Sequence, residues 1–219
     1  MTRYVDLSIP LEESIPRWKI KFESEYNTHS HKASTISLSV HTATHLDAPL
    51  HYVAGAPGVD QFPLELAVCQ ALILDLTSTG KNQAIDVDDI AGRFPANYPE
   101  AIILRTDWPR RWWRTPAFWA EAPYVTQRAA AWLAGKQIRI VGYDFPQDLA
   151  IRHIASGKAT AADFVVHHEI LSKGIWQIEY LTNLHQLGTE RATLLICPLP
   201  LAGLEASPVR VLGKPVREE

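Results

Sequence analysis

The sequence predicts an α/β protein built as one domain over residues 1–219. Runs rich in Ile, Val and Leu recur along the chain, and several are nearly continuous, as buried strands are. Segments with helix-capping signals lie between these runs, and this alternation favours an α/β fold. The composition is that of an ordinary globular protein, with 47% hydrophobic and 21% charged residues, and a chain of 219 residues can bury a sizeable core.

The apolar runs predict the individual strands, and the capping residues between them predict the helices. Strands are expected over residues 3–7, 35–40, 71–76, 101–105, 138–143, 175–179, 192–197 and 209–212. Helices are expected over residues 86–93, 127–134 and 164–173. The residues that start and stop them are Asp86 or Asp88 for the first helix, Thr126 and Gly135 for the second, and Asp163 and Gly174 for the third.

The run from His41 to His51 is the strongest functional signal in the chain. It reads His-Thr-Ala-Thr-His-Leu-Asp-Ala-Pro-Leu-His, with His45 and Asp47 inside it. Imidazole and carboxylate are ligands that Zn and Mn prefer, so the run predicts a metal site. Neither one helix nor one extended strand would bring the three histidines and the aspartate together. We therefore expect a half-buried core strand over 36–40, followed by an irregular turn on which these side chains converge.

A second polar pair appears late in the chain. His167 lies on the expected helix 164–173, and Glu179 ends the expected strand 175–179. A carboxylate between apolar neighbours is costly unless it is paired, hydrogen-bonded or bound to metal. The pattern alone leaves two interpretations open, a salt-bridged glutamate at a strand rim and a metal ligand.

The segment 108–119 contains four of the seven tryptophans and three arginines, Arg110, Arg111 and Arg114. Such a loop is consistent with an aromatic wall over a pocket, with a subunit contact, or with a packed surface loop. The arginines are candidates to hold a substrate carboxylate, although a solvated surface role is favoured for any one of them. The two cysteines, Cys69 and Cys197, lie in apolar runs and are expected to be small buried side chains.

The charge pattern narrows the partners. The net charge is −3, the isoelectric point is near 6.3, and no basic block or stripe is present, which argues against nucleic acid. The first twenty residues carry several charges and no apolar core run, so we expect neither a secretory signal nor a membrane span. The expected location is the cytoplasm.

The run 41–51 resembles the signature of the metal-dependent cyclase family, which includes bacterial kynurenine formamidase and isatin hydrolase. That signature is His-x-Gly-Thr-His-x-Asp-x-Pro-x-His, and one defined position departs from it, because Ala43 stands where the family has glycine. Weaker similarity extends over nearly the whole chain. It lies at residues 6–10, 105–108, 141–144, 167–168, 179, 199–201 and 206–210.

The resemblance implies a swivelling β/β/α fold and a homodimer or a dimer of dimers. It also implies one or two divalent metal ions, Zn or Mn. The residues that match family positions are His41, His45 and Asp47 as the first ligand set, Asp47 as a bridge, His167 and Glu179 as completing a second position, and His51 as the catalytic histidine. The resemblance further places segment 16–19 near the active site across a subunit contact, so Trp18 is expected to line the substrate pocket. Alanine at position 43 costs stability only if its φ is positive.

These features together predict a metal-dependent hydrolase of an amide-type C–N bond. Metal-activated water would attack the carbonyl, and His51 would serve as general acid/base. The leading substrate is an aryl formamide such as N-formylkynurenine, a small aromatic molecule. The alternatives are hydrolysis of an isatin-type lactam and a dehydratase or cyclase reaction on the same metal site. A metal-binding module without catalysis is disfavoured, because His51 exceeds a sufficient ligand set.

Overall fold

A closed ring of seven strands forms the centre of the protein. This computed structural model describes residues 4–15, 17–26 and 31–216. The ring runs in the order β12–β11–β5–β7–β9–β10–β4 and closes where β4 pairs with β12, while β1 adds to the outside of β12. The strands are β1 (Val5–Asp6), β4 (His45–Asp47), β5 (Val68–Asp75), β7 (Ala101–Arg105), β9 (Ile140–Tyr143), β10 (Trp176–Glu179), β11 (Arg191–Pro198) and β12 (Ala206–Pro215).

The apolar runs of the sequence correspond to the strands of this ring. Strands β5, β7, β9 and β10 pair in this order as parallel neighbours. Every ring pair that includes β4, β11 or β12 is antiparallel, apart from the parallel pairs already named. Parallel strands are covered on both faces, which explains their nearly continuous Ile, Leu and Val. The prediction of an α/β fold is confirmed, and β7 has the expected bounds. Residue 3 of the first expected strand lies outside the described residues.

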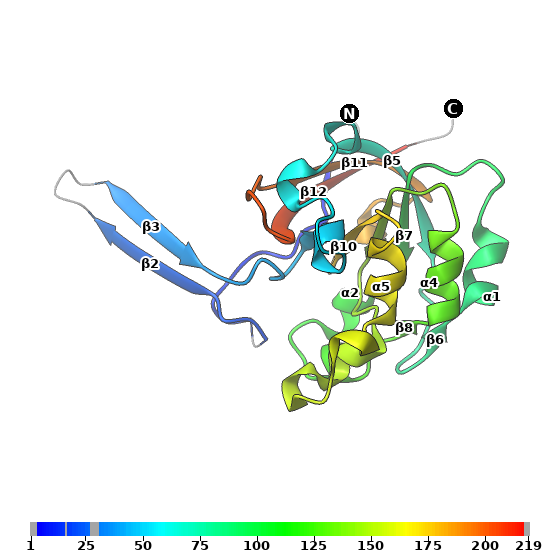
Figure 1. Cartoon of the computed structure of the whole chain (residues 1–219), viewed down its shortest axis with the longest axis horizontal. Coiled ribbons are helices and arrows are strands. Elements are labelled where there is room, and N and C mark those ends of the chain that lie inside the picture. The colour runs from blue at the N-terminus through cyan, green and yellow to red at the C-terminus, as the bar shows by residue number, and fades with distance from the viewer. Residues whose placement is uncertain (1–3, 16, 27–30, 217–219) are drawn as a thin grey trace.

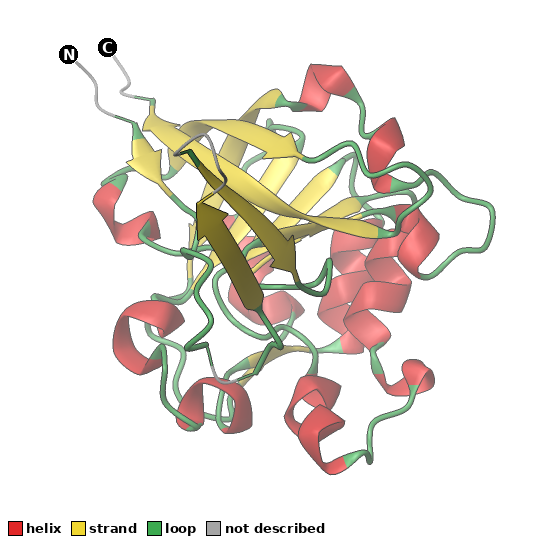
Figure 2. Cartoon of the chain, turned by 90° about the vertical axis from the view of Figure 1, so that its left-hand side faces the viewer, coloured by secondary structure: helices red, strands yellow, loops and turns green. Residues whose placement is uncertain are grey.

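Two apolar clusters lie on the two faces of the ring. The inner cluster takes residues from all seven strands: Leu46, Ile73, Ile103, Ile140, Ile178, Leu194 and Val211. The outer cluster packs β5, β7 and β9 against the helices α1 (Val87–Ile90), α4 (Gln127–Ala134) and α5 (Val165–Leu171). Figure 1 shows α1, α4 and α5 side by side on one flank, and Figure 2 shows the strands above most of the helices. Successive side chains along one strand therefore point alternately into the inner cluster and toward the outer face.

Two of the three predicted helix starts are confirmed. Thr126 Oγ1 accepts a hydrogen bond from Ala129 N at 3.1 Å, and Asp86 Oδ1 accepts one from Val87 N at 2.8 Å. The predicted cap of the third helix is wrong. Asp163 instead accepts hydrogen bonds from Thr160 in a separate turn, and α5 begins at Val165. A capping pattern read from sequence cannot distinguish two adjacent helical turns.

The expected core strand over 35–40 is also wrong. The chain there forms β3 (Lys32–Ser37), which pairs with β2 (Lys21–Tyr26) in a two-stranded hairpin that projects from the body (Figure 1). Every residue of β3 is exposed. Alternation with period two identifies a strand, but it does not say whether the apolar face meets the core of the same chain. The segment that does enter the sheet is β4, where we expected an irregular turn.

The tryptophan-rich segment folds into two short helices, α2 (Trp108–Trp112) and α3 (Ala117–Ala120). Trp108 is fully buried, and its indole N–H donates to the carbonyl of Phe118 at 3.0 Å. A short parallel pair, β6 (Ala84–Ile85) with β8 (Tyr124–Val125), completes the elements. Cys69 is buried as expected, but Cys197 is exposed, which corrects that prediction. Among the described residues, no helix has the length and apolar character needed to cross a membrane.

Candidate metal centre

Four polar side chains share the outer face of β4 and β10. Glu179 is paired in register with His45, and Gln177 with Asp47. The residues between them, Leu46 and Ile178, belong to the inner cluster, so the four polar side chains point to the opposite face. All four are buried. Strand β4 has three residues and pairs with β12 on one edge and β10 on the other. The pairing with β10 places His45 and Asp47 beside Glu179.

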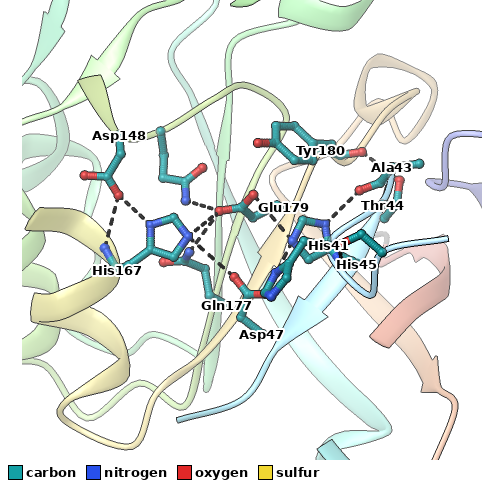
Figure 3. A network of polar contacts seen from close by, with 12 residues as sticks. His41, Ala43, Thr44, His45, Asp47, Asp148, His167, Gln177, Glu179 and Tyr180 are labelled. Carbon is teal, nitrogen blue, oxygen red and sulfur yellow. Dashed lines mark hydrogen bonds and ion pairs between the residues drawn. The ribbon is translucent and has the colours of Figure 1, made fainter. Parts of the chain in front are cut away.

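Two further histidines complete this cluster. His41 Nδ1 lies 2.9 Å from Asp47 Oδ1, and His45 Nε2 lies 3.3 Å from the same oxygen. His167 comes from α5, and its Nε2 lies 3.6 Å from Asp47 Oδ2 and 2.8 Å from Glu179 Oε1. The structure thus brings together all five residues that the sequence nominated as ligands, with Asp47 at the centre (Figure 3).

The potential ligand atoms form two overlapping groups. His41, His45 and Asp47 offer atoms that all lie within 4.8 Å of one another, and so do Asp47, His51 and His167. Asp47 belongs to both groups, as expected of a bridging carboxylate. Glu179 belongs to neither of them. His51, expected as the catalytic histidine, thus stands within ligand distance of Asp47.

Three buried atoms at the centre form no hydrogen bond within the described residues, and their close polar neighbours include one another and the ring nitrogens of His41 and His167. No hydrogen bond from the described part of the chain reaches His45 Nε2, Asp47 Oδ1 or Asp47 Oδ2. Such atoms are costly to bury unless a cation or a donor satisfies them. Two imidazole nitrogens and a carboxylate are the donor set that Zn and Mn accept, so the residues present fit a divalent ion.

Acceptors behind the histidines determine which nitrogen faces the centre. His45 Nδ1 lies 2.8 Å from the carbonyl oxygen of Ala43, and His167 Nδ1 lies 2.6 Å from Asp148 Oδ2. An acceptor at Nδ1 holds the proton there and leaves Nε2 free to bind a metal. Ala43 has φ +52°, in the left-handed region, so a glycine at this position would avoid a steric cost that alanine carries. In His41 the acceptor lies at the other ring nitrogen, because Nε2 is 3.3 Å from Glu205 Oε1. Nδ1 is therefore the nitrogen of His41 that faces Asp47.

The carboxylates and imidazoles of the centre shift each other's pKa. Burial alone would raise the pKa of Asp47, but the charge of His45 and the contact with His167 hold it well below the usual 3.8. Burial is likewise outweighed at Glu179, where the charge of His167 lowers the pKa to about 2. The pKa of His167 is raised well above 6.5, since Glu179 and Asp148 overcome the effect of burial. The centre therefore keeps its carboxylates ionised and ready to bind a cation.

His51 has a different environment. It ends the short 3-10 turn Pro49–His51, and its ring centroid lies 4.3 Å from that of His41 and 5.7 Å from that of His167. Burial, together with the two neighbouring histidines, lowers the pKa of His51 to about 4, against the opposing effect of Asp47. The imidazole is thus neutral at pH 7 and able to accept a proton, with a lower pKa than the unperturbed value assumed from the sequence.

A cleft of about 620 Å³ opens onto the metal centre. Its lining includes His41, His45, His51, His167 and Glu179, with Arg17, Trp18, Tyr52, Ile151, Phe164 and Tyr180 among the walls. The ring centroid of Trp18 lies 5.6 Å from that of Tyr180 and 5.3 Å from that of Trp119. Trp18 therefore lines the cleft of its own chain, and no subunit contact is needed to bring it there. Pro16, in the same segment, lies outside the described residues.

The arginines of the tryptophan-rich segment do not line this cleft. Arg111 donates to the carbonyl of Thr106 at 2.7 Å, and Arg114 forms an ion pair with Glu12. Arg17 lies at the cleft instead, with its guanidinium carbon 4.3 Å from the ring centroid of Trp119. The arginine that lines the cleft is thus Arg17, next to Trp18 in the chain.

Sequence reasoning missed three buried residues that support the centre. Asp148 accepts hydrogen bonds from Val166 N and His167 N as well as contacting His167 Nδ1, so it is the residue that fixes the start of α5. Gln147 and Gln177 both donate to Glu179 Oε1. Gln177 could have been noticed, because it is a polar residue between the apolar Trp176 and Ile178. Gln147 and Asp148 follow β9 and lacked any local signal.

Comparisons with known proteins agree with this fold. Residues 5–147 match the family model described as "Putative cyclase". The kynurenine formamidase of Geobacillus thermodenitrificans (strain NG80-2) is 27% identical over 217 residues, covering 96% of each chain. The structure of a predicted metal-dependent hydrolase from Bacillus stearothermophilus has a TM-score of 0.75 at 30% identity, covering 97% of this chain and 98% of that one.

A further solved structure matches in fold. Isatin hydrolase A from Labrenzia aggregata, bound to benzyl benzoate, has a TM-score of 0.81 at 24% identity and covers 99% of this chain and 94% of its own. The kynurenine formamidase relative and the metal-dependent hydrolase structure make this chain a metal-dependent hydrolase, and the His/Asp cluster is consistent with that class. The chain belongs to the cyclase family, as the resemblance in segment 41–51 implied.

Proposed function

We propose that the protein hydrolyses the amide-type C–N bond of an aryl formamide such as N-formylkynurenine, using one or two divalent ions, Zn or Mn. His41, His45 and Asp47 would hold the first ion, and Asp47, His167 and Glu179 would border a second position. The observation that carries the proposal is the set of buried ligand atoms without hydrogen-bond partners at His45 and Asp47, of which His45 lines an aromatic-walled cleft. Relatives of similar length are named kynurenine formamidases.

The chain's own residues supply proton transfer and substrate placement. A bound divalent ion polarises a carbonyl and lowers the pKa of water. His51, neutral at pH 7, accepts a proton from the attacking water and returns it to the departing nitrogen. An aryl amine leaves more easily than an alkyl amine. The walls formed by Trp18, Phe164 and Tyr180 suit a flat ring and exclude water around it.

The experiment that tests the proposal is an assay of substrates with matched leaving groups. The panel contains aryl formamides, isatin-type lactams, alkyl amides and simple esters, each tested with the protein after chelator treatment and after Zn or Mn is added back. We expect aryl formamides to react fastest and the chelator to abolish the reaction. Equal rates for aryl and alkyl substrates would refute the aromatic pocket. Cleavage of no C–N bond would favour the dehydratase or cyclase alternative.

Arg17 favours the formamide over the lactam. N-formylkynurenine carries a carboxylate that isatin lacks, and Arg17 is positioned at the cleft to pair with it. We expect Arg17→Gln to raise KM for N-formylkynurenine about tenfold, the effect of losing one exposed charge-assisted contact, and to leave isatin turnover unchanged. Arg110→Gln, on an exposed arginine outside the cleft lining, is the matched control. An equal effect of Arg17→Gln on both substrates would show that it acts only through the packing on Trp119.

We also propose a homodimer or homotetramer in the cytoplasm that acts on small molecules and not on nucleic acid. The support is the projecting hairpin, where Phe22 faces Ile36 across the strands and Ile36 is 59% exposed. Exposed apolar pairs of this kind are typical of surfaces that a partner covers. Light scattering of the purified protein should give a mass at least twice 24.5 kDa, and a lone monomer would contradict the proposal.

A further inference from the structure

Tyr180 has a left-handed backbone conformation directly after Glu179. Its φ is +57°, which a bulky residue rarely adopts because its Cβ then crowds the neighbouring backbone. Such strain persists only where the surroundings hold the chain, and it is concentrated at functional sites. Here Thr44 Oγ1 donates to the carbonyl of Tyr180 at 2.7 Å, and Leu181 N donates to the carbonyl of Tyr143 at 2.8 Å (Figure 3). Glycine would adopt this conformation without strain, so the backbone by itself does not explain a tyrosine at this position.

The left-handed residue changes the face on which the tyrosine lies. Side chains alternate along β10, so that Ile178 points into the inner cluster and Glu179 points to the outer face. Continued alternation would turn Tyr180 inward. Tyr180 belongs instead to the outer cluster, and Leu181 belongs to the inner one. Two consecutive side chains, the candidate ligand Glu179 and the ring of Tyr180, therefore share one face of the sheet.

The ring of Tyr180 contacts both the metal centre and a cluster of aromatic rings. Its centroid lies 5.6 Å from that of His45 and 5.6 Å from that of Trp18, and both of these side chains line the cleft with it. Trp119 and Phe118, which belong to the tryptophan-rich segment and not to the cleft lining, lie 5.3 Å and 6.4 Å from it. The ring is only 4% exposed. Its position at the cleft is therefore fixed by packing as well as by the backbone.

We infer that Tyr180 is a specificity-determining residue, which selects a flat aromatic group beside the bond that is cleaved. The inference rests on the proposed function in one respect, that the cleft is the substrate site. A ring fixed beside His45 offers a planar surface that a flat group covers with many close contacts, whereas a puckered saturated ring of similar size makes fewer. A ring that is already fixed also loses little conformational entropy when a ligand binds. The strained backbone places this surface next to the metal centre.

The binding of two ketones tests this inference without reference to turnover. Acetophenone carries a flat phenyl ring, and cyclohexyl methyl ketone is its saturated counterpart with at least as much apolar area, so burial alone does not favour acetophenone. Calorimetry gives the Kd of each ketone for the purified protein. We expect the wild type to bind acetophenone about fivefold more tightly, which is the usual effect of one aromatic contact.

Three substitutions separate the ring of Tyr180 from its backbone. Tyr180→Phe keeps the ring and should keep the preference. Tyr180→Leu keeps the strain without the ring, Tyr180→Gly removes both, and each should reduce the preference to less than about twofold. The matched control is Phe62→Leu, since Phe62 is a buried ring of the inner cluster that packs on Trp176 at 5.1 Å, and it should leave the preference unchanged.

Several outcomes would overturn the inference. A wild type without the preference would do so, and so would a folded Tyr180→Leu variant that retains it. Loss of the preference in Tyr180→Phe would assign the selection to the hydroxyl and not to the ring. If Tyr180→Gly does not fold, the leucine variant and the wild type decide the matter. A wild type that prefers acetophenone but hydrolyses no aryl formamide would instead refute the proposed function and leave the specificity of the cleft in place.

Discussion

Asp47→Ala is expected to abolish both metal binding and hydrolysis. Asp47 is fully buried at the centre of the cluster, within 3.6 Å of nitrogen atoms of His41, His45 and His167. It belongs to both groups of potential ligands, so its removal takes a ligand from either ion position. The imidazoles would also lose the anion that favours their approach, since Asp47 raises the pKa of His45. Elemental analysis of the purified variant measures the first effect and the formamide assay the second.

The matched control is Asp88→Ala, which removes a carboxylate whose side chain is 89% exposed in α1. It should leave metal content and turnover unchanged, and the unfolding free energy within about 0.5 kcal/mol. Asp47→Asn separates charge from shape, because the amide keeps the volume but offers one oxygen fewer. We expect it to behave like the alanine variant. Normal metal content in Asp47→Ala would contradict the central role of this carboxylate.

His51→Ala is expected to keep the metal and the fold but to lose turnover by about 10²-fold or more, the usual contribution of a general acid/base. His51 lies beside His41 with its pKa lowered to about 4, so it is a neutral base at pH 7. The sign of the pH dependence follows. Activity that needs neutral His51 is present above this pKa and is lost as the pH falls through it. The variant should lose that limb of the profile, which a pH series of kcat/KM detects.

His45→Ala provides the comparison that distinguishes a base from a ligand. His45 is buried with Nε2 unpaired beside Asp47, so its removal should release the metal. His51 also lies within ligand distance of Asp47 and His167, which makes the comparison necessary. If His51→Ala loses metal as fully as His45→Ala, then His51 is a ligand. The control is His153→Ala, at an exposed histidine outside the cleft lining, and it should change neither quantity.

Part of the centre was predictable because the residue types that bind metals can be recognised within one short segment. Three histidines and an aspartate in segment 41–51 identified a metal site before any strand was placed. His167 and Glu179 were harder, and the similarity to a known family raised them above a surface ion pair. Gln147 and Asp148 could not be found in this way. Their function depends on which side chain lies opposite, and β9 and β10 are neighbours only through parallel pairing across more than thirty residues of sequence.

The sequence by itself determined six of the seven strands of the ring and the helix starts at Asp86 and Thr126, and it indicated the candidate ligand side chains. Each of these depends on local hydrophobic pattern, capping or ligand type. Tertiary structure alone decided that β3 projects as an exposed arm and that His45–Asp47 is the strand that closes the ring. It also decided that both glutamines meet one oxygen of Glu179. The physical reason is that strand pairing is decided by contacts between segments that are distant in the sequence. The hydrophobic pattern of one segment does not specify which strand it pairs with or which side chains share its face.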